Sequence, residues 1–243
     1  ILKSLGMLAW KVGSGELVSH QLLGAIAETA ADTGSPVLLS TGMTTFAEVE
    51  IAAGLVRQSG AELGIFQCTS RYPASFEDVG LNVIEELRTR WKCPVGLSDH
   101  TGTVYPALVA IARGADMIEI YFALDKSMFG PDIGVSLTPD DITLLRSARD
   151  AVVAMDAHPV DNDAMAAEMA PMRMLFNKSV APVRPLAAGT KLESHMLTEK
   201  KPGTGIPAAD LPNLVGRVLA REVSPDHLLV FEDLEPSIGP ELL

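Results

Sequence analysis

Cysteine is scarce in this sequence. Two cysteines, Cys68 and Cys93, occur in 243 residues, and they form neither a CxxC pair nor a cluster with metal-type spacing. This scarcity excludes a disulfide framework as the basis of the fold and is typical of a protein kept in the reducing cytoplasm. We interpret both thiols as small, buried, apolar side chains.

Positive charge is also limited. The chain has 19 lysines and arginines against 31 aspartates and glutamates, which gives a formal net charge of -12, and the basic residues form no cluster. This balance argues against sequence-independent binding of nucleic acid or of an anionic membrane surface. An anionic ligand would therefore have to be held by a few well-placed donors.

Long apolar runs are missing as well. No run approaches the roughly 18 residues needed to cross a membrane, and no signal-peptide pattern is visible. The sequence is nevertheless 47% hydrophobic, enough to build one large domain or one large and one small domain. Because it opens on Ile1 and enters a helix-like pattern at once, we expect a fragment or a trimmed form of a longer chain.

Short apolar runs alternate with helical patterns in the first two thirds of the chain. The segments 20–34 and 44–60 carry apolar residues at helical spacing and end at glycine, as helices commonly do. This alternation predicts a parallel α/β fold. The five apolar runs are residues 7–16, 36–43, 63–70, 93–100 and 115–122.

Each of the five runs ends in polar residues, as in GSGE, STGM and SDHT. In a (β/α)8 barrel the active site is built from the carboxyl ends of all the strands, whereas a doubly wound sheet uses this edge only near a switch point. We therefore predict an α/β fold comprising the last five units of a (β/α)8 TIM barrel, with about three strands missing from the front.

Composition divides the chain into three segments. Residues 1–155 carry the barrel units, and residues 156–175 form a Met- and Ala-rich linker whose methionines we interpret as packing residues. Residues 176–243 hold short alternating pieces separated by Pro and Gly. They predict a small, β-rich domain with one short helix near Asp210 to Leu214.

A series of motifs resembles the N-acetylneuraminate (sialic acid) synthase family. In chain order they are KVGSGE, LLSTGM, CTSRYP, GLSDHTG, FALD and GPD, and KKPGTGIP in the tail is similar to a motif of the family's antifreeze-like (SAF) domain. The resemblance implies condensation of phosphoenolpyruvate with an N-acetylated amino sugar such as N-acetylmannosamine. It also implies a domain-swapped homodimer in which each tail caps the partner's barrel.

For phosphoenolpyruvate, the resemblance implies Lys11 and Ser14 of KVGSGE as binding residues, with Ser70 and Ser98 as further donors. An ammonium and a hydroxyl at a strand end can face a dianion while the neighbouring glycines let backbone N–H groups approach it. The alternative for Lys11 is a lysine that snorkels at a turn. Thr41 offers either another hydroxyl or ordinary turn sequence.

Other resemblances concern water and the sugar. Glu16 matches a strand-end glutamate that orients the attacking water, although an exposed carboxylate at a helix N-terminus is the alternative. Tyr72 in SRYP and Asp132 in GPD match sugar contacts, while Asp132 also suits a turn. Lys201 stands where the family commonly has an arginine that reaches the N-acetyl group, and it offers a point charge in place of a planar fork.

The resemblance also implies one divalent metal, manganese or magnesium, held by two histidines. His100 of SDHT matches the first, but Tyr121 stands at the position of the second and Ile120 replaces a lysine. A neutral imidazole binds a metal at pH 7, whereas a phenol with a pKa near 10 must first lose a proton. Three interpretations stay open: a metal on His100 with water and substrate, a hydrogen bond from Tyr121 to the aldehyde oxygen, or loss of the usual activity.

The remaining polar residues have simpler interpretations. We expect Asp99 and Thr101 to support the turn after the fourth run, and His20, His158, His195 and His227 to be surface or loop residues. The leading hypothesis is a phosphoenolpyruvate-dependent N-acetylneuraminate synthase. The alternatives are a divergent phosphosugar-binding or lyase-type protein, and a fragment that does not catalyse alone because its open sheet edges drive association.

Overall fold

A computed structural model describes residues 2–236 of the chain. The chain divides into two compact units, Ile1–His158 and Pro159–Leu243. Among residues 2–236, no helix has both the length and the apolar character required to cross a lipid bilayer.

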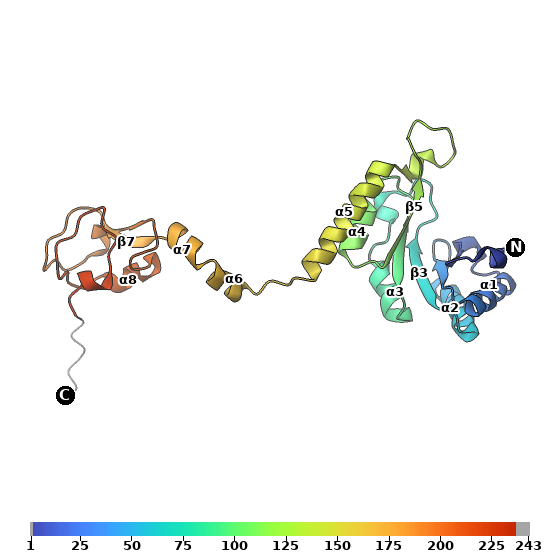
Figure 1. Ribbon diagram of the computed structural model, residues 1–243, viewed down its shortest axis with the longest axis horizontal. Helices are drawn as coiled ribbons and strands as arrows, with labels where there is room; N and C mark the ends of the chain where they lie inside the picture. Colours follow the sequence, from blue (N-terminus) through green and yellow to red (C-terminus); the bar gives the residue numbers. More distant parts are fainter. Residues whose placement is uncertain (1, 237–243) are drawn as a thin grey trace. The chain divides into compact units, whose positions relative to one another are not determined.

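The first unit is built on one parallel sheet whose six strands follow each other in sequence order (Figure 1). The strands are β1 (Trp10–Val12), β2 (Val37–Ser40), β3 (Leu63–Cys68), β4 (Val95–Asp99), β5 (Met117–Phe122) and β6 (Ser136–Leu137). The helices that connect and follow them are α1 (His20–Thr33), α2 (Phe46–Ser59), α3 (Val83–Trp91), α4 (Tyr105–Ala112) and α5 (Pro139–Asp156).

The predicted parallel α/β class is confirmed, as are the five predicted strands and the helices α1 and α2. The prediction of five strands was one short, because β6 adds a two-residue strand that pairs in parallel with β5. A strand of two residues is too short to show a period of alternation. The eight-stranded closure of the barrel stays a prediction.

Local signals in the sequence set the ends of the first two helices. Gly34 and Gly60 follow α1 and α2 with φ of 68° and 85°, in the left-handed region that glycine adopts without strain. Thr45 and Glu48 form a capping box at the start of α2. Each helix therefore stops where the chain must turn back into the next strand.

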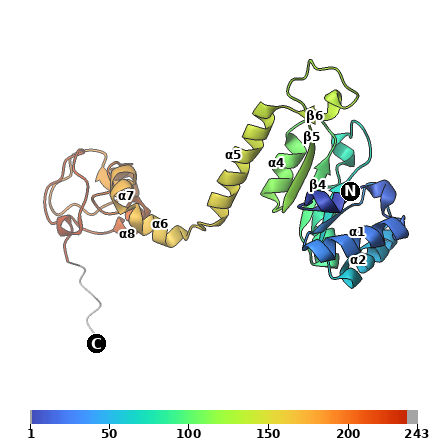
Figure 2. The ribbon, with the colours of Figure 1, turned by 45° about the vertical axis from the view of Figure 1, so that its right-hand side comes forward.

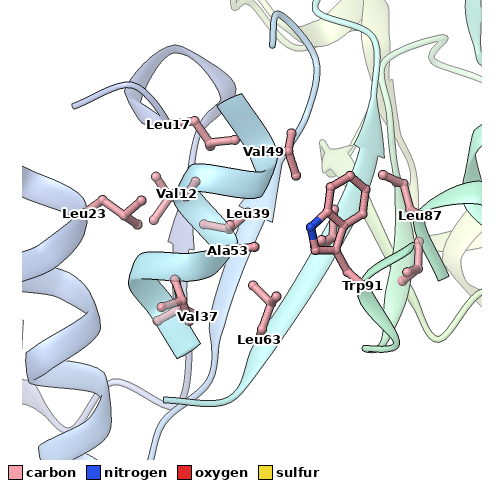
Figure 3. Close-up of a cluster of buried hydrophobic side chains, with 14 of the residues drawn as sticks. Val12, Leu17, Leu23, Val37, Leu39, Val49, Ala53, Leu63, Leu87 and Trp91 are labelled. Atoms are coloured by element: carbon pink, nitrogen blue, oxygen red, sulfur yellow. The ribbon is translucent and has the colours of Figure 1, made fainter. Parts of the chain in front are cut away.

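The main core lies between the sheet and helices α1, α2 and α3. Alternate strand residues such as Val37, Leu39 and Ile65 face the helices and are fully buried, while Trp91 from α3 closes one side (Figure 3). Burial of one such aliphatic side chain contributes roughly 1.5–3 kcal/mol. This packing fixes the positions of the strand ends on which the polar residues lie.

A smaller apolar cluster joins α4 and α5 to the last strands. Ala107 of α4, Leu137 of β6 and Leu145 of α5 are its buried members, and Figure 2 shows the two helices side by side next to β5. The short β6 is therefore anchored by packing as well as by pairing. It is the last strand of the sheet and lies next to β5, which carries pocket residues.

The second unit has its own core and little regular structure. Strands β7 (Ser179–Pro182) and β8 (Leu197–Lys200) pair in antiparallel fashion, and helices α6 (Asn162–Glu168), α7 (Ala170–Phe176) and α8 (Leu211–Leu214) complete it. The short helix predicted near Asp210 to Leu214 is confirmed as α8. The buried core residues are Val180, Leu186, Leu192, Leu197, Ile206, Leu214, Leu219, Val223, Leu229 and Leu234.

Candidate active site

A cavity of about 460 Å3 opens at the carboxyl ends of strands β1 to β5. This volume lies in the range of small-molecule sites. Each of the five strands, or the loop that follows it, contributes at least one polar side chain, as the alternation of apolar and polar residues predicted. The lining residues are Lys11, Gly13, Ser14, Gly15, Ser40, Met43, Cys68, Ser70, Tyr72, His100, Glu119, Ile120 and Tyr121.

An ion pair across the cavity shows how strongly the sheet is curved. Lys11 on β1 and Glu119 on β5 have Nζ and Oε1 3.1 Å apart. In a flat sheet these strands would lie about 19 Å apart, since each of four steps adds about 4.8 Å. The sheet therefore curls around the cavity, as part of a barrel wall would.

The same carboxylate also binds Ser98. Oε1 of Glu119 accepts a 2.7 Å hydrogen bond from Ser98 Oγ on β4. Ser98 is 3% exposed and lies beneath the lining residues, so it contributes to the cavity through Glu119. Lys11 on β1 and Ser98 on β4 thus both contact one oxygen atom of Glu119 on β5.

Several serine hydroxyl groups also line the cavity. Ser14 Oγ and Ser70 Oγ, from the loops after β1 and β3, lie 3.1 Å apart. Ser40, at the end of β2, is 2% exposed, and its Oγ has no hydrogen-bond partner among the described residues. A buried hydroxyl without a partner is costly, so Ser40 Oγ is suited to bind a ligand oxygen.

His100 lies just after β4 and is almost completely buried. Its Nδ1 is 3.0 Å from the carbonyl oxygen of Thr69, a distance at which Nδ1–H donates and Nε2 is left as an acceptor. Nε2 lies 3.4 Å from Ser98 Oγ. Burial lowers the pKa of His100, but its bonds with the Cys68 thiol and the Thr69 carbonyl outweigh burial and raise that pKa above its ordinary value.

Cys68 is a small, buried side chain, as predicted from the sequence, but its neighbours are polar. Cys68 lines the cavity, and its strand partner in β4 is Ser98, which brings His100 beside the thiol. Burial raises the pKa of Cys68, but the hydrogen bond and charge of His100, with hydroxyl groups of Ser98 and Ser70, lower it overall. This pairing could not be predicted from the sequence, because His100 follows the neighbouring strand and is distant from Cys68 along the chain.

Three neighbouring rings line the cavity. Tyr72 lies 4.4 Å from His100 and 6.1 Å from Tyr121 between ring centroids, and His100 lies 5.6 Å from Tyr121. Burial, followed by the nearby Tyr121 and Cys68, raises the pKa of Tyr72. The Tyr72 phenol therefore stays protonated at neutral pH and can donate a hydrogen bond.

The turn after β4 is built as expected. The backbone N–H and the hydroxyl of Thr101 donate to Asp99 at 3.1 and 3.0 Å, which confirms the supporting role predicted for this pair. Burial raises the pKa of Asp99, against the lowering effect of those two bonds. This turn holds His100 at the cavity wall.

Besides Ser98, three further predicted site residues lie outside the cavity lining. Glu16 is exposed at the end of a short helix, Ser14–Glu16. Asp132 is exposed, and its carbonyl oxygen accepts from Ser136 Oγ at 2.8 Å, as the turn interpretation suggests. Lys201 belongs to the second unit, where its Nζ lies 5.2 Å from the ring centroid of Phe176. Their functional roles stay predictions.

The sequence reasoning missed Ser40 and Glu119. Both could have been found from strand alternation, because Ser40 follows Leu38 by two residues and Glu119 precedes Tyr121 by two. The pairing of Glu119 with Lys11 had no such signal. It depends on the curvature of the sheet.

The donor set falls short of a metal site. Among residues 2–236 no group of three or more His, Cys, Asp or Glu side chains is arranged to hold a metal ion. His100 has the tautomer of a metal ligand, since its second nitrogen is fixed by a carbonyl, but Tyr121 offers a phenol at the second position. Binding of a metal at His100 therefore stays a prediction.

Comparison with known proteins gives two family matches along the chain. The NeuB family matches residues 1–159 and the SAF domain matches residues 177–235. N,N'-diacetyllegionaminic acid synthase of Legionella pneumophila is 33% identical over 243 residues, covering 96% of this chain and 65% of that protein. N-acetylneuraminate-9-phosphate synthase of Mus musculus is 32% identical, covering 96% of this chain and 64% of that protein.

A solved structure extends the likeness to three dimensions. The N-acetylneuraminic acid (sialic acid) synthetase of Leptospira borgpetersenii matches with a TM-score of 0.62 and 28% identity, over 71% of this chain and 59% of that chain. The chain thus spans less than two thirds of the length of each of these three proteins.

Proposed function

Because this chain belongs to the NeuB family, we propose that it takes part in the synthesis of a nonulosonic acid from phosphoenolpyruvate and an N-acetylated amino sugar. The observation that carries the proposal is the cavity at the strand ends, which is lined by one ammonium group and by several serine hydroxyls. Such a set suits an anionic ligand with many oxygen atoms. The named relatives are synthases of legionaminic and sialic acids, which agrees with this class of product.

Phosphoenolpyruvate would bind through its phosphate and carboxylate. Among the described residues, Lys11 is the only lysine or arginine in the cavity lining. Ser14 and Ser70 line the same cavity, and Ser98 binds the carboxylate with which Lys11 pairs. Ser40 adds a hydroxyl without a partner among the described residues. Fixed donors of this kind hold a reactant in one orientation, which lowers the entropic part of the barrier.

The proposed reaction joins two carbon atoms and releases phosphate. C3 of phosphoenolpyruvate bonds to the aldehyde carbon of the open-chain sugar, and the aldehyde oxygen takes up a proton to become a hydroxyl. Water adds at C2, and phosphate leaves with cleavage of the C–O bond. Tyr121, whose ring lies next to those of His100 and Tyr72, would donate a hydrogen bond to the aldehyde oxygen as negative charge develops there.

The remaining predicted site residues keep proposed roles. Glu16 would orient the attacking water, and Tyr72 and Asp132 would contact sugar hydroxyls. Lys201 would bind the N-acetyl group from the second unit of a partner chain in a domain-swapped homodimer. The family resemblance supports these four roles, and each is open to substitution.

A second candidate follows from Tyr121. A phenol in place of an imidazole favours a divergent member of the family that binds a phosphosugar, or that acts without a divalent metal. A metal held by His100 with water and substrate remains the competing prediction. The two differ in whether a chelator stops turnover.

Phosphate release tests the proposed function. The protein is incubated with phosphoenolpyruvate and a panel of N-acetylated hexosamines, each with manganese and with EDTA. We expect release with at least one sugar, and release that persists in EDTA if Tyr121 activates the aldehyde. Release abolished by EDTA would assign a metal to His100, and no release with any sugar would contradict the synthase function.

A histidine at position 121 separates the two candidates. Tyr121→His restores the second imidazole beside His100, so a synthase that has lost its metal site should gain turnover that depends on manganese. The measurement is phosphate release by the variant with and without manganese, and Tyr105→His, away from the cavity lining, is the matched control. Unchanged turnover in manganese would favour a function that never used a metal at this position.

A further inference from the structure

One carboxylate oxygen in the cavity is bound by two of the donors that the proposed function assigns to the ligand. Oε1 of Glu119 lies 3.1 Å from Lys11 Nζ and accepts the 2.7 Å hydrogen bond from Ser98 Oγ. The side chains of Glu119 and Lys11 are 33% and 42% exposed, so both are within reach of a ligand in the cavity. The oxygen of Glu119 stands where an anionic ligand oxygen would stand between the same two donors.

An entering anion must therefore compete with Glu119. A carboxylate and a phosphate oxygen form the same kind of charge-assisted hydrogen bond with an ammonium or hydroxyl group. Among residues 2–236, no other lysine or arginine lines the cavity to take up the second negative charge. Two anions around one ammonium repel each other, and partial burial weakens the screening by water.

We propose that Glu119 is an internal counter-anion, which holds Lys11 and Ser98 in place in the free site and is displaced from them when an anionic ligand binds. The inference rests on the proposed function for its view of Lys11 and Ser98 as ligand donors. It adds that Glu119 is a positioning residue that sets the affinity for anions. Ser40 Oγ lies outside this exchange and stays available to the ligand.

Glu119 could either hold the two donors in place or compete with the ligand for them. These two roles predict opposite changes in anion affinity when Glu119 is neutralised. If Glu119 only braced Lys11 and Ser98, its neutralisation would loosen both donors and weaken anion binding. Under competition, Glu119→Gln removes the negative charge and keeps an oxygen that accepts from Ser98. We expect the Kd for an anion to fall about fivefold, the factor that corresponds to the upper value for a partly exposed ion pair.

Isothermal titration calorimetry with two probes tests the proposal. The wild-type chain, Glu119→Gln and Glu50→Gln are each titrated with phosphoenolpyruvate and, separately, with inorganic phosphate. Glu50 is exposed on α2 and lies outside the cavity lining, so Glu50→Gln changes the net charge equally without touching the site. We expect tighter binding of both anions by Glu119→Gln and wild-type affinity for Glu50→Gln.

A background without the cation provides a further control. Lys11→Met removes the group for which Glu119 and the ligand compete, so the gain from Glu119→Gln should shrink in the double variant. Should Glu119→Gln fail to fold, Glu119→Asp serves as the second variant, because its shorter side chain reaches Lys11 less well. It is expected to bind phosphate more tightly than the wild type.

Failure of this inference is distinguishable from failure of the proposed function. If Glu119→Gln binds anions equally or more weakly while the wild type binds phosphoenolpyruvate, Glu119 is not a competing counter-anion. The proposed function is not contradicted by that result. Tighter binding of phosphate without any binding of phosphoenolpyruvate supports the counter-anion and contradicts the function. Absence of binding by every protein overturns both, because neutralising Glu119 should have exposed the site.

Discussion

Asp233 illustrates how a single residue can hold a small domain together. Its carboxylate is fully buried in the second unit, and it accepts hydrogen bonds from Arg221, from the backbone N–H of Val230 at 2.8 Å and from His227 at 2.6 Å. Burial acts to raise the pKa of Asp233, but these bonds outweigh it and lower the pKa below its ordinary value. His227, expected only as a surface or loop residue, thus contacts a buried charge.

The stability of the second unit should depend on this carboxylate in acid. Because the folded-state pKa of Asp233 lies below the unfolded value of about 3.9, its contribution is present above that pH and is lost as pH falls through the folded-state pKa. Asp233→Asn should lower the free energy of unfolding at pH 7 by about 2–4 kcal/mol and flatten its decline below about pH 4. Urea unfolding between pH 7 and pH 2 measures both effects, and an acid profile identical to that of the wild type would refute the assignment.

Some residues of the cavity could be predicted from the sequence, and others could not. Lys11, Ser14 and His100 could be placed at the cavity because polar residues directly follow apolar strands. Glu119 could not be paired with Lys11, since 108 positions of chain separate them and only the curl of the sheet brings them together. The burial of Cys68 was predicted, but its neighbour His100 was not, because His100 follows another strand.

At the scale of elements, the inner face of the sheet depends on glycine. A Cβ on Gly96 of β4 would lie 2.5 Å from the carbonyl oxygen of Met117 and 2.6 Å from Cε1 of Phe66. Neither atom belongs to a flexible side-chain end, so the strands would have to shift. The close approach of β4 to its neighbours supports the curvature that brings β1 and β5 to one cavity.

Two alanine substitutions separate this steric effect from backbone entropy. Gly96→Ala should lower the free energy of unfolding of the first unit by about 1–3 kcal/mol through overpacking. Gly54→Ala on α2 should raise it by up to about 1 kcal/mol, because nothing lies within 4 Å of the added Cβ and alanine favours the helix. Thermal unfolding of both variants decides the matter, and a stabilising Gly96→Ala would show that the strands are not in tight contact.

Helices and strands with complete local signals were predictable. The capping box of Thr45 and Glu48 and the glycines after α1 and α2 are written in the sequence. β6 was not predictable, because its two residues show no alternation and its position depends on packing against α4 and α5. A helix or strand can therefore be predicted from the sequence when nearby residues determine where it begins and ends.

At the scale of the whole molecule, the chain joins two units with separate cores. The core of the first unit lies between the sheet and its helices, and that of the second unit contains residues such as Leu192, Ile206 and Leu219. The order of motifs in the sequence predicted both parts. The curvature that creates the cavity was expected only through the barrel hypothesis.

Separate cores imply that the second unit folds alone. A chain of residues 159–236 should give a dispersed amide NMR spectrum and a cooperative thermal transition, since its core does not draw on the first unit. Leu219→Ala, at a fully buried position, should lower the midpoint temperature of this transition, because it removes core contacts. A collapsed spectrum for residues 159–236 would show that the unit needs the rest of the protein.

The proposed function depends most on Lys11 as the residue that anchors phosphoenolpyruvate in the cavity. The most direct measurement is a phosphorus NMR titration of phosphoenolpyruvate with the wild type, Lys11→Met and Lys3→Met, where Lys3 pairs with Asp32 on the exposed surface. We predict saturable binding by the wild type and Lys3→Met, and a Kd about 10- to 100-fold higher for Lys11→Met, as expected for loss of a charged hydrogen bond. Equal affinity of Lys11→Met and the wild type, or no binding by any of them, would contradict the account.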